Sequence, residues 1–290
     1  MQEQRSHIRN TRGATANTPA DPVVAANPQI ASGNQSVARA LSMLALLATV
    51  PDGMGVRDIA KRLKLAPSIV QRGINTLAAS GFVERSHVPQ RYRIGYTAFQ
   101  VGNAFLNGSD LAEIATSELH VLTQETRTNT YLGVLRDSRV VYLVCVRSNS
   151  PLVINTVPGS TAPLHATAFG KALVCDLPDE GIRALLGREP YEQLTPKTKT
   201  SFGAVLADIR EGSARGYFTS DGENLANVVA VGAPVRDAAG QVVAAISAAT
   251  LRAQIRKGEL PALCAAVRGA AERVSRRLGA PTRLPPPGTR

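Results

Sequence analysis

The stretch GVRDIAKRLKLAPSIVQRGINTLAASGFVER, residues 55–85, decides the fold of the N-terminal part of the chain. In residues 56–65 apolar positions recur at helical spacing and basic side chains occupy the remaining positions, which predicts a short amphipathic helix. A break at Pro67 precedes a second apolar series at i, i+4 and i+7, formed by Val70, Ile74 and Leu77. Gly81 is suited to end that second helix. The stretch therefore predicts two short helices joined by a tight turn.

The flanking residues extend this pattern on both sides. Upstream, Ser36 can cap a helix over residues 37–50, in which apolar residues recur at helical spacing: Val37, Leu41, Leu44 and Ala48. Downstream, the short alternating runs FVER (82–85) and RYRI (91–94) flank a turn and predict a hairpin. Three short helices followed by a basic hairpin predict a winged helix-turn-helix over residues 35–95.

Gly73 is unusual because it lies in the middle of the second helix of the motif. A glycine there costs about 1 kcal/mol relative to alanine. It indicates a close approach of another helix or of DNA, or simply a weaker helix.

A helix-turn-helix places its second helix in the major groove of DNA, where outward side chains contact base edges or phosphates. The candidate DNA-binding residues are Arg57, Ser68, Ile69, Gln71, Arg72, Asn75, Arg85, Arg91 and Arg93. Gln71 and Asn75 can each pair with adenine, and Arg72 can pair with guanine or a phosphate. The alternative is an ordinary amphipathic helix with a solvated polar face. The close helix spacing and the basic hairpin favour DNA binding.

Charge supports the same interpretation. The chain carries a net charge of +11, and residues 1–100 hold 12 Lys and Arg against 5 Asp and Glu, whereas residues 101–290 hold 21 against 17. Clustered positive charge favours a polyanionic partner through counterion release. Residues 1–34 are rich in Asn, Thr, Ala and Pro and are expected to form a disordered arm. Consecutive prolines predict a disordered tail over 281–290.

The cysteines and the apolar runs exclude several classes. Cys145, Cys175 and Cys264 are widely spaced and form no Cys-x-x-Cys or Cys/His cluster, so neither a disulfide framework nor a metal site is predicted. No apolar run approaches the roughly 20 residues that cross a bilayer, and the N-terminus lacks a signal-peptide core. We expect a soluble cytoplasmic protein with no membrane association.

The rest of the chain predicts an α+β domain. An apolar stripe in TAFQVGNAFLN (97–107) predicts a linker helix over 96–108, and residues 109–280 form the second domain. Strands are expected near 129–135, 140–147, 152–157, 216–220, 228–236 and 242–249, and helices near 110–126, 166, 179, 201–214 and 259–278. A turn at Asp237 and Gly240 between apolar runs is typical of a hairpin. We therefore expect an antiparallel sheet covered by helices.

The stretch APLHATAFGKAL (162–173) places His165 and Lys171 among small apolar residues. A hydrolytic site that uses His165 is conceivable. The sequence, however, contains no GxSxG elbow, phosphate loop, HExxH motif or paired-carboxylate motif. We expect His165 to hold a strand-to-helix turn through a backbone hydrogen bond, and Lys171 to reach a carboxylate at the surface. No catalytic residue and no cofactor are predicted.

Seven stretches in this order resemble the IclR family of bacterial transcription regulators, from Ser36 to Gly279. They are SVARALSMLALLA, GVRDIAKRLKLAPSIVQRGINTLAASGFVER, RYRIGYTAFQVG, GSTAPLHATAFGKAL, LTPKT, RGY and APVRDAAGQVVAAISAA. The resemblance implies that the second domain is a GAF-like effector-binding domain. It also implies homodimers or homotetramers that bind palindromic double-stranded operators, repress or activate genes, and sense small organic acids or aromatic metabolites.

The resemblance also implies a set of effector-binding positions: Ile154, Ala162, Ala168, Phe169, Ser220, Val228, Ala230, Ser247 and Ala249. The family usually has Asp at the position of Ser220, often Cys at that of Ala230, and commonly Gly at that of Asn227. It frequently has a small or aliphatic residue at the position of Phe169, whose ring can stack on a planar ligand or fill the space. We expect a smaller or more apolar effector than family members with Asp and Cys prefer. A sensor or oligomerisation module that docks protein partners is the alternative, and the salt dependence of DNA affinity separates the two.

Overall fold

A computed structural model describes residues 34–107, 110–149, 156–256 and 258–281. The chain divides into two compact units, Met1–Ala104 and Phe105–Arg290. The division falls inside helix α4 (Tyr96–Asn107), in the region where the apolar stripe predicts a linker helix. Residues 1–33 and 282–290, which make up nearly all of the expected arm and tail, lie outside the described residues.

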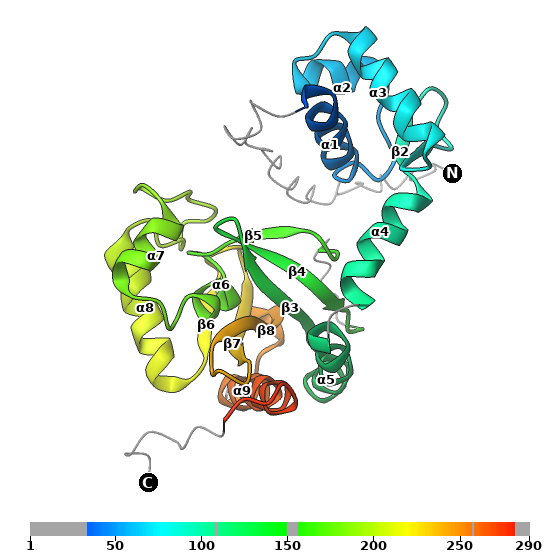
Figure 1. Cartoon of the computed structure of the whole chain (residues 1–290). Helices are drawn as coiled ribbons and strands as arrows, with labels where there is room; N and C mark the ends of the chain where they lie inside the picture. Colours follow the sequence, from blue (N-terminus) through cyan, green and yellow to red (C-terminus); the bar gives the residue numbers. More distant parts are fainter. Residues whose placement is uncertain (1–33, 108–109, 150–155, 257, 282–290) are drawn as a thin grey trace, which may run out of the picture. The chain divides into compact units, whose positions relative to one another are not determined.

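The N-terminal unit is a winged helix-turn-helix, as the sequence predicts. Its elements are α1 (Gln35–Leu47), α2 (Val56–Leu63), α3 (Pro67–Ala79), β1 (Val83–Arg85) and β2 (Tyr92–Ile94). The two strands pair antiparallel with Glu84 opposite Arg93 and form the wing that follows α3 in Figure 1. The core of this unit contains Met43, Leu47, Ile59, Val70 and Ile74. Burial of the apolar side of α3 leaves its polar side on the surface.

The start of α1 differs from the prediction. The N-cap is Asn34 and not Ser36, because the Asn34 side chain accepts hydrogen bonds from the backbone N–H groups of Ser36 and Val37 at 3.0 and 3.4 Å. Asn and Ser are equally good capping residues, so the sequence alone did not separate them. At the other end of the motif, Gly81 follows α3 with φ of +73°, as expected for a residue that ends a helix.

The inward face of α1 also differs from the prediction. Val37 and Leu41 are 54% and 60% exposed, whereas Met43, Leu46 and Leu47 are buried. This helix is apolar around most of its circumference, so two candidate stripes compete and periodicity does not choose between them.

Gly73 lies where α3 packs against the buried side of α1. A Cβ atom at position 73 would lie 2.8 Å from the sulfur of Met43. Close approach to α1 therefore accounts for this glycine.

The C-terminal unit is built on one antiparallel sheet. Its elements are α5 (Asp110–Thr126), β3 (Asn129–Arg136), β4 (Arg139–Val146), β5 (Thr161–Pro163), α6 (Ala168–Leu173), α7 (Asp179–Leu186), α8 (Phe202–Arg215), β6 (Phe218–Asp221), β7 (Val228–Arg236), β8 (Val242–Leu251), the 3₁₀ turn η2 (Arg252–Gln254) and α9 (Glu259–Arg277). The six strands are ordered β5-β4-β3-β8-β7-β6, and each neighbouring pair is antiparallel. The predicted α+β class is confirmed.

Helices cover both faces of this sheet (Figure 1). α5 and α9 pack on one face around Leu119, Leu132 and Val267. α6 and α8 lie on the other face, where the core includes Phe169 and Phe218. Because helices cover both faces, β3 and β8 are buried along most of their length and do not alternate between buried and exposed residues.

Three details of this unit were not anticipated. The short strand β5 was missed, and helix α6 begins at Ala168 and not near Ala166, because the Thr167 hydroxyl caps it by accepting from the Gly170 N–H. Of the predicted strand 152–157, residues 152–155 lie outside the described residues, and Thr156 and Val157 are not in a strand.

Among the helices in the described ranges, none is long and apolar enough to cross a bilayer.

Candidate nucleic-acid interface and ligand pocket

The outward face of α3 carries the side chains that the sequence singled out. Ser68, Gln71, Arg72 and Asn75 are exposed, and Ile69 is half-buried. On this face Gln71 Nε2 donates a hydrogen bond to Asn75 Oδ1 at 2.8 Å. The polar groups form one continuous row because residues three and four apart lie on the same side of a helix.

The candidate arginines of the wing and of α2 differ in whether their side chains are paired with other groups of the protein. Arg93 pairs with Glu84 across the hairpin, with Nη2 2.7 Å from Glu84 Oε1. Arg91 Nη1 lies 3.5 Å from the carbonyl oxygen of Gly53, at the limit of a hydrogen bond. Arg85 and Arg57 are exposed. Sequence reasoning treated the arginines alike and missed Glu84, although direct cross-strand pairing of opposite charges is a recognisable signal.

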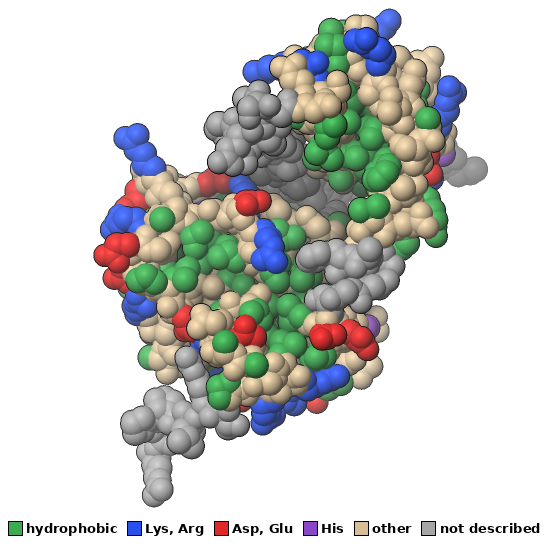
Figure 2. Space-filling view, in the orientation of Figure 1, with side chains coloured by type: hydrophobic (Ala, Val, Ile, Leu, Met, Phe, Trp, Pro, Cys, Tyr) green, Lys and Arg blue, Asp and Glu red, His purple; other side chains and the backbone are tan. Residues whose placement is uncertain are grey.

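On the face shown in Figure 2, Lys and Arg side chains lie at the top and sides of the N-terminal unit. Together with the row on α3, they provide the positive surface that attraction to a phosphate backbone requires.

The predicted ligand positions converge on the α6 face of the sheet. Ser220, Ala230 and Ala249 occupy neighbouring positions on β6, β7 and β8, because Ser220 pairs with Ala230 and Ala230 with Ala249. Ala162, Ala168, Phe169 and Ser247 are buried, and Val228 is half-buried. Ile154 lies outside the described residues.

The Phe169 ring packs directly onto the sheet. It is 3% exposed and contacts Tyr142 edge to face, with ring centroids 5.0 Å apart. A Cβ atom built at Gly133 would collide with this ring, so the absence of a side chain on β3 makes room for it. Phe169 therefore fills space above β3.

The two hydroxyl groups among these positions already have acceptors. Ser220 Oγ donates to the carbonyl oxygen of Ala166 at 2.8 Å, and Ser247 Oγ donates to that of Val231 at 2.9 Å. Each hydroxyl has a single proton to donate. The two oxygens can still accept, but neither proton is free, and the other described side chains at these positions are apolar.

His165 has a structural role that differs in detail from the prediction. Its Nε2 lies 3.0 Å from the carbonyl oxygen of Glu192, so it joins the turn before α6 to a segment 27 residues further along the chain. Burial lowers the pKa of His165, against the opposing effect of that hydrogen bond. The ring also lies beside Tyr191, with centroids 5.4 Å apart.

Lys171 does not reach the surface, contrary to the prediction. Its side chain is 1% exposed, and Nζ lies 2.7 Å from Asp208 Oδ2 and 2.9 Å from Glu223 Oε2. It also donates to the carbonyl oxygen of Thr219 at 3.2 Å. α6 lies between the sheet and α8, so the long side chain runs inward and finds its carboxylates there. The partners are 37 and 52 residues away, and no local sequence signal reveals them.

Lys199 completes a cluster of two cations and two carboxylates. Its Nζ lies 2.6 Å from Asp208 Oδ2 and 3.4 Å from Glu223 Oε1. Burial acts to raise the pKa of Asp208, but hydrogen bonds from Lys171 and Lys199 outweigh it and hold the pKa below its usual value. Burial likewise acts to lower the pKa of Lys199, and the two carboxylates raise it on balance. The cluster connects α6, α8 and the end of β6.

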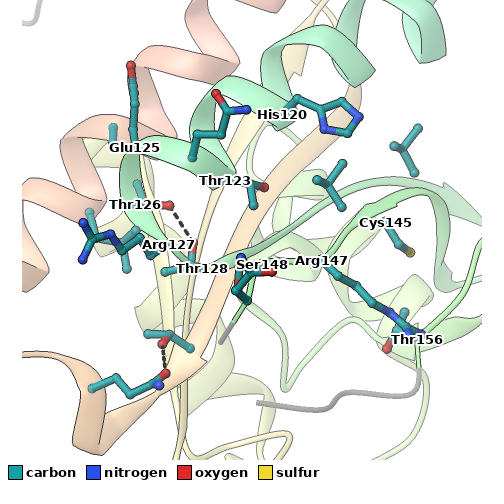
Figure 3. Close-up of a pocket in the computed structure, with 18 of the residues that line it drawn as sticks. His120, Thr123, Glu125, Thr126, Arg127, Thr128, Cys145, Arg147, Ser148 and Thr156 are labelled. Carbon is teal, nitrogen blue, oxygen red and sulfur yellow. Dashed lines mark hydrogen bonds between the residues drawn. The ribbon is translucent and has the colours of Figure 1, made fainter. Parts of the chain in front are cut away.

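A separate groove of about 1560 Å³ lies at the end of the sheet beside α5 and α9 (Figure 3). His120, Thr123, Arg127, Arg147 and Thr156 are among its lining residues. Its described lining includes none of the predicted effector-binding residues. Sequence reasoning did not single out this groove.

Several threonine hydroxyls at this groove are hydrogen-bonded within the protein. Thr123 Oγ1 and Thr130 Oγ1 are 2.6 Å apart, and Thr126 Oγ1 and Thr128 Oγ1 are 2.8 Å apart. Within the described ranges, no three or more His, Cys, Asp or Glu side chains are grouped to hold a metal ion.

Comparison with known families identifies the class of protein. Residues 36–87 match the IclR helix-turn-helix domain, and residues 103–276 match the bacterial transcriptional regulator IclR C-terminal domain. The chain therefore belongs to the IclR family: it is a DNA-binding transcriptional regulator with an effector-binding C-terminal domain, and not an enzyme.

Individual relatives agree with this assignment. The chain is 33% identical to the HTH-type transcriptional regulator BhcR of Paracoccus denitrificans, over 84% of this chain and 87% of that protein. It is 34% identical to the glycerol operon regulatory protein of Streptomyces coelicolor, over 85% and 97% of the two chains. The crystal structure of an IclR transcriptional regulator from Alicyclobacillus acidocaldarius superposes with a TM-score of 0.75 at 26% identity, covering 84% and 98%.

Proposed function

We propose that this regulator binds a palindromic operator as a homodimer or homotetramer, through α3 and the β1–β2 wing. A small apolar or aromatic metabolite on the α6 face of the effector-binding domain changes its operator affinity. The observation that carries the DNA-binding part is the division of α3 into two sides. Val70, Ile74 and Leu77 are buried, while Gln71 and Arg72 are exposed.

The proposed control is a linkage between the two sites. A ligand shifts an equilibrium only by its difference in affinity for the two states. In our proposal the effector favours one arrangement of the linker helices, which changes the spacing of the two reading heads on the operator. Coupling of this kind is typically about 1 to 3 kcal/mol, a change of several-fold to about a hundredfold in affinity.

Arg72→Ala should weaken operator binding by about 5- to 150-fold, since a base or phosphate contact of this type is worth roughly 1–3 kcal/mol. The side chain is exposed, so the fold should be unaffected. Fluorescence anisotropy on a fragment obtained by genomic footprinting measures the change, and circular dichroism checks the fold. Arg188→Ala, which removes the same charge from an exposed site in the other unit, should leave the affinity unchanged. Equal affinity of Arg72→Ala and the wild type would refute the assigned role.

Effector preference follows from the polar groups of the α6 face. Ser220 already donates to Ala166, and Ala230 has no polar side-chain atom. A ligand hydroxyl buried there without a partner costs about 1–3 kcal/mol. Calorimetry should therefore find that small aliphatic and aromatic carboxylic acids bind more tightly than polyhydroxylated sugar acids, which carry the same carboxylate and several more hydroxyl groups. The double variant Ser220→Asp, Ala230→Cys should gain affinity for the sugar acids. Tight binding of a sugar acid to the wild type would contradict the proposal.

A further inference from the structure

A hydrogen bond joins the side-chain amides of Gln71 and Asn75 on the outward face of α3. Both side chains are exposed and lie one turn apart on α3, yet Nε2 of Gln71 donates to Oδ1 of Asn75 at 2.8 Å. From the sequence alone, either residue can pair with adenine. The contact between them, together with their places along α3, separates their roles.

The donors and acceptors of a carboxamide show which groups of each side chain remain free to contact a base. A carboxamide has one oxygen that accepts and one NH₂ group with two protons to donate. Gln71 uses one proton in this bond and keeps an N–H together with its oxygen. Asn75 uses one of the two acceptor sites of its oxygen and keeps the other together with both protons. Each amide thus retains a donor and an acceptor, and the bond between them fixes how the two amide groups are oriented.

Adenine is the base whose major-groove edge fits that retained pair. It presents the N7 acceptor beside the N6 amino donor, and a bidentate amide matches both. Guanine presents two acceptors, which an amide edge with one donor and one acceptor cannot satisfy together. Gln71 also lies in the N-terminal half of α3, the part of a recognition helix that contacts base edges.

We propose that Gln71 reads an adenine in each operator half-site, and that Asn75 is a positioning residue that orients the Gln71 amide. The proposal rests on the proposed function, since it requires α3 to enter the major groove. Glutamine is among the side chains that lose most rotamer freedom when they are ordered. A bond already formed in the free protein lowers that loss, because the amide is held before DNA arrives.

Selection from a random double-stranded DNA library, with the full chain, tests this assignment. For the wild type we expect one position in each half-site at which adenine is preferred over the other bases by about 5- to 150-fold. Gln71→Glu places an acceptor-only carboxylate there, which suits the N4 amino group of cytosine. The preferred base should change from adenine to cytosine at that position, and the other positions should keep their preferences.

Asn75→Ala tests the positioning role separately. Adenine should remain the preferred base, but by a margin several-fold smaller, because the Gln71 amide is no longer oriented. Thr76→Ala is the matched control on the same helix. Its hydroxyl bonds to the carbonyl oxygen of Arg72 within α3, so its loss should leave every base preference unchanged.

The possible failures are distinguishable. If the wild type enriches no sequence, the proposed DNA-binding function itself is wrong. If it enriches a site whose base preferences are unchanged in Gln71→Glu, the function stands and the assignment of Gln71 is overturned. If Asn75→Ala abolishes the adenine preference and Gln71→Glu retains it, Asn75 is the reader. Circular dichroism of each exposed-site variant confirms that the winged helix is folded.

Discussion

Lys171→Met should destabilise the effector-binding domain by about 3–5 kcal/mol, the usual cost of removing one partner from a buried ion pair. The cost arises because Glu223, which is almost fully buried, loses its nearest cation while Lys199 remains 3.4 Å away. For a domain of this size the Tm should fall by roughly 10 °C. Thermal unfolding of the full chain by circular dichroism measures the shift.

A matched substitution at the surface isolates the effect of burial. Lys197 forms a pair with Asp221 at 3.8 Å, and both side chains are substantially exposed. Lys197→Met should cost less than about 1 kcal/mol, as exposed pairs do. Equal, small losses in Lys197→Met and Lys171→Met would contradict the account of the buried cluster.

Gly232→Ala should cost about 3 kcal/mol and impair ligand binding on the α6 face. A Cβ atom at this position of β7 would lie 2.7 Å from the backbone of Ala168 and Phe169. Backbone atoms cannot rotate away, so α6 would have to move off the sheet. Overpacking of this kind usually lowers the free energy of unfolding by about 1–3 kcal/mol. Because the neighbouring atoms here are backbone atoms, we expect a loss at the upper end of that range. Urea unfolding of the full chain measures the loss.

Gly203→Ala provides the corresponding control. It lies in α8, is exposed, and a Cβ atom there meets no heavy atom within 4 Å. The change should be neutral or stabilise the protein by up to about 1 kcal/mol. If Gly232→Ala behaves like Gly203→Ala, α6 does not pack on β7 as closely as described.

The winged helix could be predicted in detail because its signals are local. Val70, Ile74 and Leu77 repeat at the helical period and are buried together, and Gly81 ends α3 with a positive φ. The same reasoning failed in α1, where Val37 and Leu41 were expected inside and are exposed. A helix that is apolar on several sides needs tertiary packing to choose its buried face.

The effector-binding positions could be proposed from the sequence as a set, but their contacts could not. The family resemblance alone pointed to Ser220, Ala230 and Ala249, and the register places them side by side. The bond from Ser220 to Ala166 and the buried partners of Lys171 depend on segments far apart in sequence. Contacts between segments far apart in the sequence produce no periodic pattern, so only the folded structure shows them.

The most direct test of the whole account is the affinity of the purified full chain for a genomic fragment recovered by footprinting. The reference is a scrambled fragment of the same length and composition. Both affinities are measured at physiological salt by fluorescence anisotropy. Specific operators usually bind at least about 10³-fold more tightly than unrelated DNA. The recovered fragment should bind more tightly than the scrambled one by a factor of that size. Equal affinities for the two fragments would contradict this prediction.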